Sequence, residues 1–156
     1  MSESLLKPPA ARSPAALGLT AAAAAGRFEL QVCANCSTVQ YPPREACVHC
    51  LTGALEWREQ SGLGELIAAT TVHHSADPYF RAQGPWRIGM VRLDAGVTVI
   101  THLHHACAET RGRVQVRALL DRAEQGVLMA FPADPAQAGT PDPQVLEMTG
   151  KGLYQR

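Results

Sequence analysis

The stretch CANCSTVQYPPREACVHC, residues 33–50, contains two Cys-x-x-Cys pairs separated by ten residues. Each pair is typical of a tight turn that points both sulfurs to one side, and two such turns can surround one tetrahedral metal ion. The connecting residues include Pro42 and Pro43, whose fixed φ angles stiffen a hairpin between the turns. The pattern therefore predicts a zinc ribbon with the ligands Cys33, Cys36, Cys47 and Cys50.

Other chemistries of four cysteines remain open at this stage. Disulfides are disfavoured in a cytoplasmic chain, and a Cys-x-x-Cys redox site needs one pair and a thioredoxin-like fold. Iron is compatible with the same four ligands, because the ligand set alone does not separate it from zinc. With four protein thiolates, no coordination position is left for water, so a structural Zn²⁺ is expected. The fifth cysteine, Cys107, is expected to pack as a small apolar residue.

Length, composition and charge limit the class of protein. The 156 residues suffice for one domain with an appendage, and no apolar run has the length of a membrane helix. The N-terminus lacks the pattern of a signal peptide, so a cytoplasmic location and no membrane partner are expected. Fourteen basic residues balance fourteen acidic ones. A neutral chain with few aromatic residues disfavours nucleic acid as the partner, although zinc ribbons and small barrels often bind it.

The chain divides by pattern into five parts. Residues 1–14 predict a mobile leader, 15–26 a short Leu- and Ala-rich helix, and 132–156 an irregular extension that is loosely attached or docks on a partner. Residues 27–60 form the ribbon, and 61–131 the following domain. In RFELQVC, Phe28, Leu30 and Val32 alternate with Glu29 and Gln31, as in a half-buried strand with its polar side chains outward.

Five strand-like runs follow the ribbon. They lie at about residues 65–73, 87–94, 97–104, 113–121 and 126–131, and turn signals separate them. Because no long helical pattern interrupts them, a small closed barrel of the OB size class is predicted. The fold class is thus mainly β: a short N-terminal helix, a zinc ribbon and a five-stranded OB-fold barrel.

Outside the cysteines, two groups of residues are candidates for binding. Aromatic and arginine side chains gather in the loop 77–87 and on the hairpin of the ribbon, where they suit a partner protein or an adenine–phosphate group. The alternatives are a hydrophobic lid over the barrel for the loop and a solvated tip for the hairpin. The candidates are Tyr79, Phe80, Arg81, Trp86 and Arg87 in the loop, and Tyr41 and Arg44 in the hairpin.

Five histidines lie at predicted strand ends: His73, His74, His102, His104 and His105. A strand places His102 and His104 on one face, which would suit a second metal. No carboxylate or cysteine nearby in sequence completes a ligand set, so polar surface is the preferred interpretation. The sequence also contains no nucleophile elbow, phosphate-binding glycine loop or Cys–His signature. We therefore expect no catalysis by this chain alone, with a stand-alone acyl-CoA enzyme as the alternative.

Three segments resemble the thiolase-associated zinc-ribbon/OB-fold proteins. They are GRFELQVCANCSTVQYPPREACVHC, LEWREQSGLGELIAATTVHH and RIGMVRLDAGVTVITHL. The resemblance covers about residues 15–131, and its specific parts are YPP after the first cysteine pair, the sequence SGLGE and the hairpin VRLDAGV. HHACAETRGRVQV departs from the pattern of the family, and the chain beyond residue 132 is not part of it.

The resemblance implies a rubredoxin-like ribbon and an accessory subunit without catalytic residues. Such subunits assist thiolase-like enzymes that make or cleave C–C bonds in acyl-CoA esters. They include acetoacetyl-CoA thiolases, hydroxymethylglutaryl-CoA synthases, steroid side-chain aldolases and benzoylsuccinyl-CoA thiolases. The expected partner is a thiolase-like catalytic chain, in an assembly with two copies of each chain. A CoA ester shared with that partner is expected near Tyr41, Arg44 and the loop 79–87.

Overall fold

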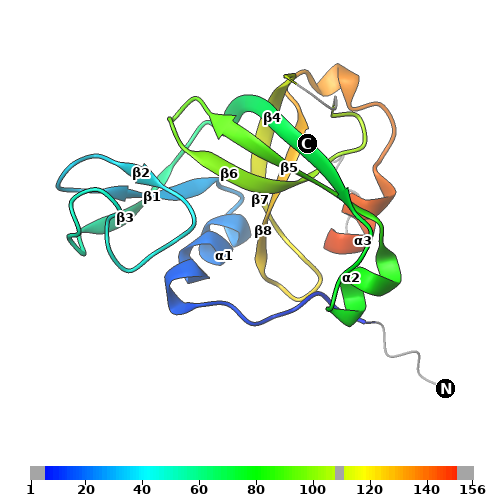
Figure 1. Ribbon diagram of the computed structural model, residues 1–156, viewed down its shortest axis with the longest axis horizontal. Helices are drawn as coiled ribbons and strands as arrows, with labels where there is room; N and C mark the ends of the chain where they lie inside the picture. Colours follow the sequence, from blue (N-terminus) through cyan, green and yellow to red (C-terminus); the bar gives the residue numbers. More distant parts are fainter. Residues whose placement is uncertain (1–5, 108–110, 151–156) are drawn as a thin grey trace.

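The computed structural model describes residues 6–107 and 111–150, in which a small sheet lies beside a β-barrel (Figure 1). The 3₁₀ helix η1 (Pro14–Ala16) and the helix α1 (Leu17–Ala24) precede the sheet. The sheet has the order β2-β1-β3, with β1 (Glu29–Cys33), β2 (Val39–Gln40) and β3 (Leu55–Glu59) antiparallel. This sheet carries all four cysteines of the two pairs on its strand ends and turns.

The barrel closes in the order β4-β5-β6-β8-β7. Its strands are β4 (Leu63–Val72), β5 (Trp86–Leu93), β6 (Thr98–Leu103), β7 (Arg113–Leu120) and β8 (Gly126–Pro132). β6 and β8 run parallel, and the other neighbours are antiparallel. The predicted fold class is therefore confirmed: a short helix, a ribbon with four cysteines and a closed five-stranded barrel.

An apolar core fills the barrel because inward-facing residues alternate along each strand. Leu66, Val91, Val99 and Val116 are completely buried there. The small residues of α1 allow this helix to approach the barrel closely. A Cβ atom at Gly126 would lie 2.9 Å from the backbone of Leu19, so only glycine fits at this contact. The alanine-rich helix thus closes one side of the barrel.

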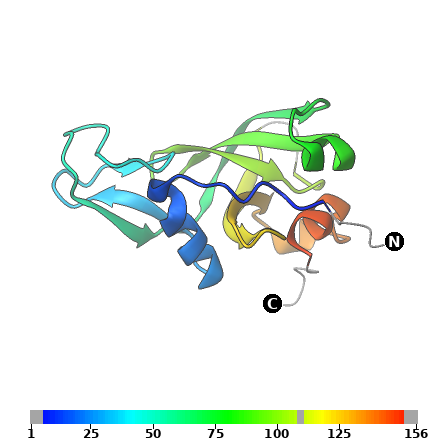
Figure 2. The same cartoon turned by 90° about the horizontal axis from the view of Figure 1, so that it is seen from below.

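Two segments have local structure that the sequence pattern did not indicate. Residues 6–13 run along the barrel, with Pro8 buried (Figure 2), and the mobility of residues 1–14 stays a prediction. The loop between β4 and β5 contains a helix, α2 (Pro78–Gln83), whose first turn is capped by the carboxylate of Asp77. Such a short helix leaves little periodic pattern in a sequence.

The C-terminal extension was expected to be irregular and loosely attached, and this interpretation is wrong for its described part. It contains the 3₁₀ helix η2 (Pro135–Gln137) and the helix α3 (Pro143–Thr149). Val145 and Met148 of α3 are buried in a second apolar cluster with Phe131 of β8. These residues therefore dock on the chain's own barrel, whereas Leu153 and Tyr154 lie outside the described residues. No helix within residues 6–107 and 111–150 is long and apolar enough to cross a membrane.

Candidate metal centre and its surroundings

The sulfurs of the two Cys-x-x-Cys pairs converge on one point. The Sγ atom of Cys33 lies 3.5 Å from that of Cys50, and Cys36 Sγ lies 3.6 Å from Cys47 Sγ. All four sulfurs are within 4.8 Å of one another. A tetrahedral Zn²⁺ with bonds of about 2.3 Å separates its sulfurs by about 3.8 Å. The arrangement therefore fits a zinc ion, and all five cysteines of the chain are free thiols, without a disulfide.

The two turns that carry the cysteines have the same backbone structure. The N–H of Ser37 donates to the carbonyl of Cys33 (2.8 Å), and the N–H of Leu51 donates to the carbonyl of Cys47 (3.0 Å). Ser37 and Leu51 both have a φ of +62°, a left-handed conformation that costs free energy in residues other than glycine. Two unfavourable conformations at equivalent positions indicate that both turns are shaped to present sulfurs.

A threonine follows each pair at the same spacing and contacts the second sulfur. Thr38 Oγ1 lies 3.2 Å from Cys36 Sγ, and Thr52 Oγ1 lies 3.3 Å from Cys50 Sγ. The hydrogen bond from the Thr52 side chain is the main reason that the pKa of Cys50 is lowered to about 5, and Thr38 likewise lowers the pKa of Cys36. Hydrogen bonds to sulfur thus favour the thiolate that a metal requires. The repeat Cys-x-x-Cys-x-Thr is visible in the sequence, but the spacing of the cysteines alone does not point to the threonines.

Two buried glutamines hold the hairpin that connects the pairs. The side chain of Gln31 donates to the carbonyl of Arg44 (2.9 Å) and accepts from its N–H (2.8 Å). Gln40 donates to Gln31 Oε1 (3.0 Å) and accepts from the N–H of Val48 (3.0 Å). The expectation that Gln31 faces outward is wrong, because its side chain satisfies backbone groups that the short hairpin cannot pair by itself.

The hairpin brings Tyr41 against the barrel. Tyr41 and Pro43 line a hollow of about 290 Å³ together with Arg12 of the N-terminal segment and Ile88 and His102 of the barrel. Tyr41 is half-buried, and burial raises the pKa of its hydroxyl. Arg44, in contrast, is exposed. The structure thus places one hairpin candidate at the junction of ribbon and barrel, and the other on the open surface.

The aromatic candidates of residues 77–87 divide into interior and surface positions. Tyr79 is 1% exposed and Trp86 is 4% exposed, as expected for a hydrophobic lid rather than for a contact surface. Phe80 is half-buried and Arg81 is exposed. Arg87 donates to the carbonyls of His104 (3.3 Å) and His105 (3.1 Å), so it supports the loop after β6. Ligand or partner contacts at these positions remain a prediction.

Phe80, Trp86 and His102 surround a second hollow of about 210 Å³, which His73 and His74 also line. The ring of His102 lies 6.2 Å from that of Phe80. Burial lowers the pKa of His102 to about 4, and its Nδ1 is buried without a described partner. The interpretation of the histidines as polar surface is therefore wrong for His102, and it is also wrong for the fully buried His104.

His104 and His105 lie beside a carboxylate that is distant in the sequence. Asp142, 37 residues after His105, accepts from the N–H of His105 (2.5 Å) and lies 3.3 Å from its Nδ1. However, Asp142 also caps α3 through Gln144 N (2.8 Å), and His104 Nδ1 accepts from the N–H of Ala106 (3.1 Å). The carboxylate of Asp142 and Nδ1 of His104 thus already accept hydrogen bonds from backbone N–H groups. The cluster is therefore better suited to anchoring α3 than to binding a metal.

Cys107 is buried, and burial raises the pKa of its thiol to about 11. Its thiol donates to the carbonyl of Ala130 (3.3 Å). The expectation that it packs as a small apolar residue is therefore confirmed.

Two family models match this chain in succession. The model described as "ChsH2, rubredoxin-like zinc ribbon domain" matches residues 20–56, and "ChsH2, C-terminal OB-fold domain" matches residues 57–119. A solved structure entitled "Ltp2-ChsH2(DUF35) aldolase" contains a chain that is 26% identical, with a TM-score of 0.66. That match covers 81% of this chain and all of the solved one.

A curated relative from Thermomonospora curvata is named "Probable enoyl-CoA hydratase alpha subunit". It is 33% identical over 79 residues, which are 49% of this chain and 24% of the relative. The chain thus spans about a quarter of the length of that protein.

Proposed function

The chain belongs to the family of ChsH2 zinc-ribbon and OB-fold proteins, and we propose from this that it is an accessory subunit of a thiolase-like enzyme that acts on acyl-CoA esters. The observation that carries the proposal is the match with the complete chain in the Ltp2-ChsH2(DUF35) aldolase structure. The name of the curated relative supports a CoA ester as the ligand. The thiolase-like partner, with two copies of each chain, is the part of the proposal that comes from the family resemblance.

In this proposal Cys33, Cys36, Cys47 and Cys50 bind one Zn²⁺. The ion supplies no chemistry, because four thiolates leave no position for water or substrate. Its role is to fix the two turns and, through them, the hairpin. Gln31 and Gln40 then hold Tyr41 and Arg44 at constant positions relative to the barrel. The ribbon thereby presents a preformed surface, which lowers the entropic cost of binding.

The acyl-CoA ester is proposed to lie on the outer face of β5 and β6. Ile88 and His102 line both the hollow below Tyr41 and the hollow beside Phe80, so the two regions predicted from sequence are neighbours. Arg12 lines the first hollow, and two exposed arginines belong to the same elements as the aromatic side chains: Arg44 to the hairpin of Tyr41 and Arg81 to the α2 of Phe80. An apolar floor flanked by guanidinium groups suits the pantetheine and phosphate parts of CoA.

The catalytic chain is proposed to cover the adjoining apolar surface. Ile67, Met90 and Ile100 of β4, β5 and β6 are 37%, 42% and 56% exposed. Met90 and Ile100, together with Ile88, two alanines and a glycine, border a shallow depression of about 220 Å³, and Ile67 directly precedes the two alanines in β4. Exposed apolar side chains that gather on one face are typical of a protein interface. In this arrangement the CoA ester would lie at the edge of the interface, in reach of catalytic residues of the other chain.

Co-expression with a thiolase-like chain encoded beside this one tests the proposal. We expect a stable complex on size-exclusion chromatography and cleavage of an acyl-CoA ester by the complex, with no turnover by this chain alone. Ile100→Glu should prevent assembly, whereas Thr98→Glu at the half-buried start of the same strand serves as the matched control. Separate elution of the two wild-type chains, or turnover by this chain alone, would contradict the proposal.

The curated relative favours a second candidate, an accessory role in hydration of an enoyl-CoA. Product analysis separates the two. Cleavage of a C–C bond releases two products, whereas hydration gives one product that is 18 Da heavier than the substrate.

A further inference from the structure

The hollow of about 210 Å³ beside Phe80 is bordered mainly by aromatic and apolar side chains. It lies where the end of β4, the helix α2 and the first half of β5 meet, and His102 of β6 completes it. We call it the aromatic hollow, after Phe80, Trp86 and His102. Of the described residues that border it, none is an aspartate, glutamate, lysine or arginine. Its lining therefore suits an uncharged, apolar part of a ligand rather than a phosphate.

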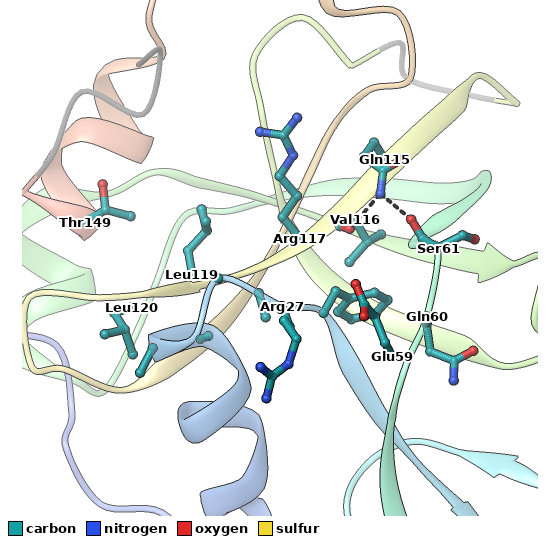
Figure 3. A pocket seen from close by; sticks show the side chains of 15 residues that line it. Arg27, Glu59, Gln60, Ser61, Gln115, Val116, Arg117, Leu119, Leu120 and Thr149 are labelled. Atoms are coloured by element: carbon teal, nitrogen blue, oxygen red, sulfur yellow. Dashed lines mark hydrogen bonds between the residues drawn. The ribbon is translucent and has the colours of Figure 1, made fainter. Parts of the chain in front are cut away.

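A groove beside β7 has a different lining. It is larger, at about 570 Å³, and Figure 3 shows charged side chains around it, among them Arg27, Glu59 and Arg117. The amide of Gln115 already donates to Ser61 O there (2.6 Å). An apolar group in this groove would take charged side chains out of water at a cost in free energy. The aromatic hollow is therefore the better place for an apolar group, although it is smaller.

The rings around the aromatic hollow hold one another in place. The indole N–H of Trp86 donates to the carbonyl of Phe80 (2.9 Å), and the two rings pack edge to face with centroids 5.4 Å apart. The ring of Phe80 is nearly parallel to that of His102, with an interplanar angle of 18°. Asp77 accepts from the N–H of Tyr79 (2.9 Å) and thereby fixes the first turn of α2, which carries Phe80. The hollow is therefore preformed, which lowers the entropic cost of binding.

His102 supplies a hydrogen-bond donor at the border of the aromatic hollow. Its Nδ1 is buried without a described partner, and a buried N–H without a partner is rare in proteins. The proton of the neutral ring is therefore placed on Nε2. Burial keeps the ring neutral near pH 7, because it lowers the pKa of His102 to about 4. The Nε2–H group is thus the part of this side chain that can donate to a ligand.

His102 also borders the hollow below Tyr41, where the lining is different. Arg12 borders that hollow, and its Nη1 is fixed because it donates to Pro9 O (2.8 Å) and Ala11 O (2.9 Å). This face of the molecule thus offers a cation, then an uncharged N–H donor, then an apolar hollow. A CoA ester has a matching order of groups: its phosphates, the pantetheine with its carbonyl oxygens, and the acyl group.

We propose that the aromatic hollow binds the apolar end of the acyl group of the CoA ester, and that His102 Nε2–H donates to a carbonyl oxygen of the same ester. This inference rests on the proposed function and adds a substrate class to it. The class is CoA esters whose acyl group carries a compact apolar unit, such as a ring. This chain then selects the acyl group, although the bond is made or cleaved by the catalytic chain.

Isothermal titration of the zinc-loaded full chain with acetyl-CoA and with benzoyl-CoA tests the acyl site. We expect benzoyl-CoA to bind about tenfold more tightly, because its ring buries apolar surface in the hollow. Val72→Phe, which fills the hollow from the end of β4, should remove this preference and leave the affinity for acetyl-CoA unchanged. Val72→Thr, of nearly the same size, should retain the preference. Equal affinities of the wild type for the two esters, or a preference that persists in Val72→Phe, would overturn the proposal.

His102→Phe tests the hydrogen bond while it keeps a ring at this position. The affinity for both esters should fall about fivefold, and His102→Gln, which still has an N–H donor, should recover part of it. Wild-type affinity in His102→Phe would contradict the role of Nε2–H. If neither ester bound to the chain, the acyl site would be refuted, whereas complex formation on co-expression would still support the accessory role.

Discussion

The ribbon and the barrel are stabilised by different means, although they are neighbours in one chain. The barrel has a continuous apolar core with completely buried residues such as Leu66 and Val116. The ribbon buries two cysteines and two glutamines beside Leu30 and Val32 of β1, and its turns contain residues with left-handed φ angles. An apolar core usually keeps its fold when one side chain is truncated. A small sheet that is held by a metal with four ligands depends on every ligand. The two regions should therefore respond differently to single changes.

The largest expected effect is that of Cys47→Ser. Structural zinc contributes on the order of 10–16 kcal/mol of apparent binding free energy, so loss of a ligand should unfold residues 27–60 while the barrel keeps its fold. Metal analysis should fall from about one zinc per chain toward none, and the amide signals of the ribbon should collapse in an NMR spectrum. Cys107→Ala, in the barrel, is the matched control and should keep its zinc. A Cys47→Ser chain that retains zinc and an ordered ribbon would show that the metal does not maintain the sheet.

Leu66→Ala should destabilise the barrel and leave the zinc site of the ribbon intact, which is the opposite of the effect of Cys47→Ser. This residue is completely buried in the barrel, and truncation of such a leucine typically costs about 2–5 kcal/mol. Chemical denaturation should show a lower midpoint for the barrel, while the zinc content stays at about one per chain. Ile67→Ala, at the exposed neighbouring position, should change the midpoint little. Loss of zinc in Leu66→Ala would mean that ribbon and barrel unfold as one unit.

The buried His102 makes the stability of the barrel depend on pH. Its pKa is about 4 in the folded chain and about 6.5 when exposed, so the unfolded chain binds the proton more tightly. Stability should therefore be complete above about pH 6.5 and fall as the pH drops toward 4, by roughly 3 kcal/mol in total. Denaturation of wild type and His102→Gln between pH 7 and 4.5 should show a smaller decrease in the variant. Equal slopes would assign the acid sensitivity to other groups, such as the zinc thiolates.

The sequence could predict the elements whose signals are local or periodic. Cysteine spacing located the ribbon, and alternating apolar residues located five strands to within two residues. The remaining features depend on residues that meet only after folding. Asp142 reaches His105 across 37 residues, and Gln31 turns inward because the carbonyl and N–H of Arg44 need partners. Neither contact produces a recognisable motif or periodic pattern in the sequence. The helix α3 is likewise too short to show the helical period of apolar residues.

The smallest effect is expected for Gln31→Ala. This variant separates zinc binding by the ribbon from recognition of a ligand or partner by its hairpin. The change leaves the carbonyl and N–H of Arg44 without their partner, and loss of buried hydrogen bonds typically costs about 1–3 kcal/mol. All four sulfurs remain, so the zinc content should stay at about one per chain while the hairpin with Tyr41 and Arg44 becomes mobile. Hydrogen exchange should then accelerate at residues 41–46, and affinity for an acyl-CoA ester or for the catalytic chain should decrease. Gln60→Ala, whose amide donates to the carbonyl of Arg58 near the surface, is the matched control. If Gln31→Ala loosened the hairpin without weakening either interaction, the ribbon would stabilise the chain but would not take part in recognition.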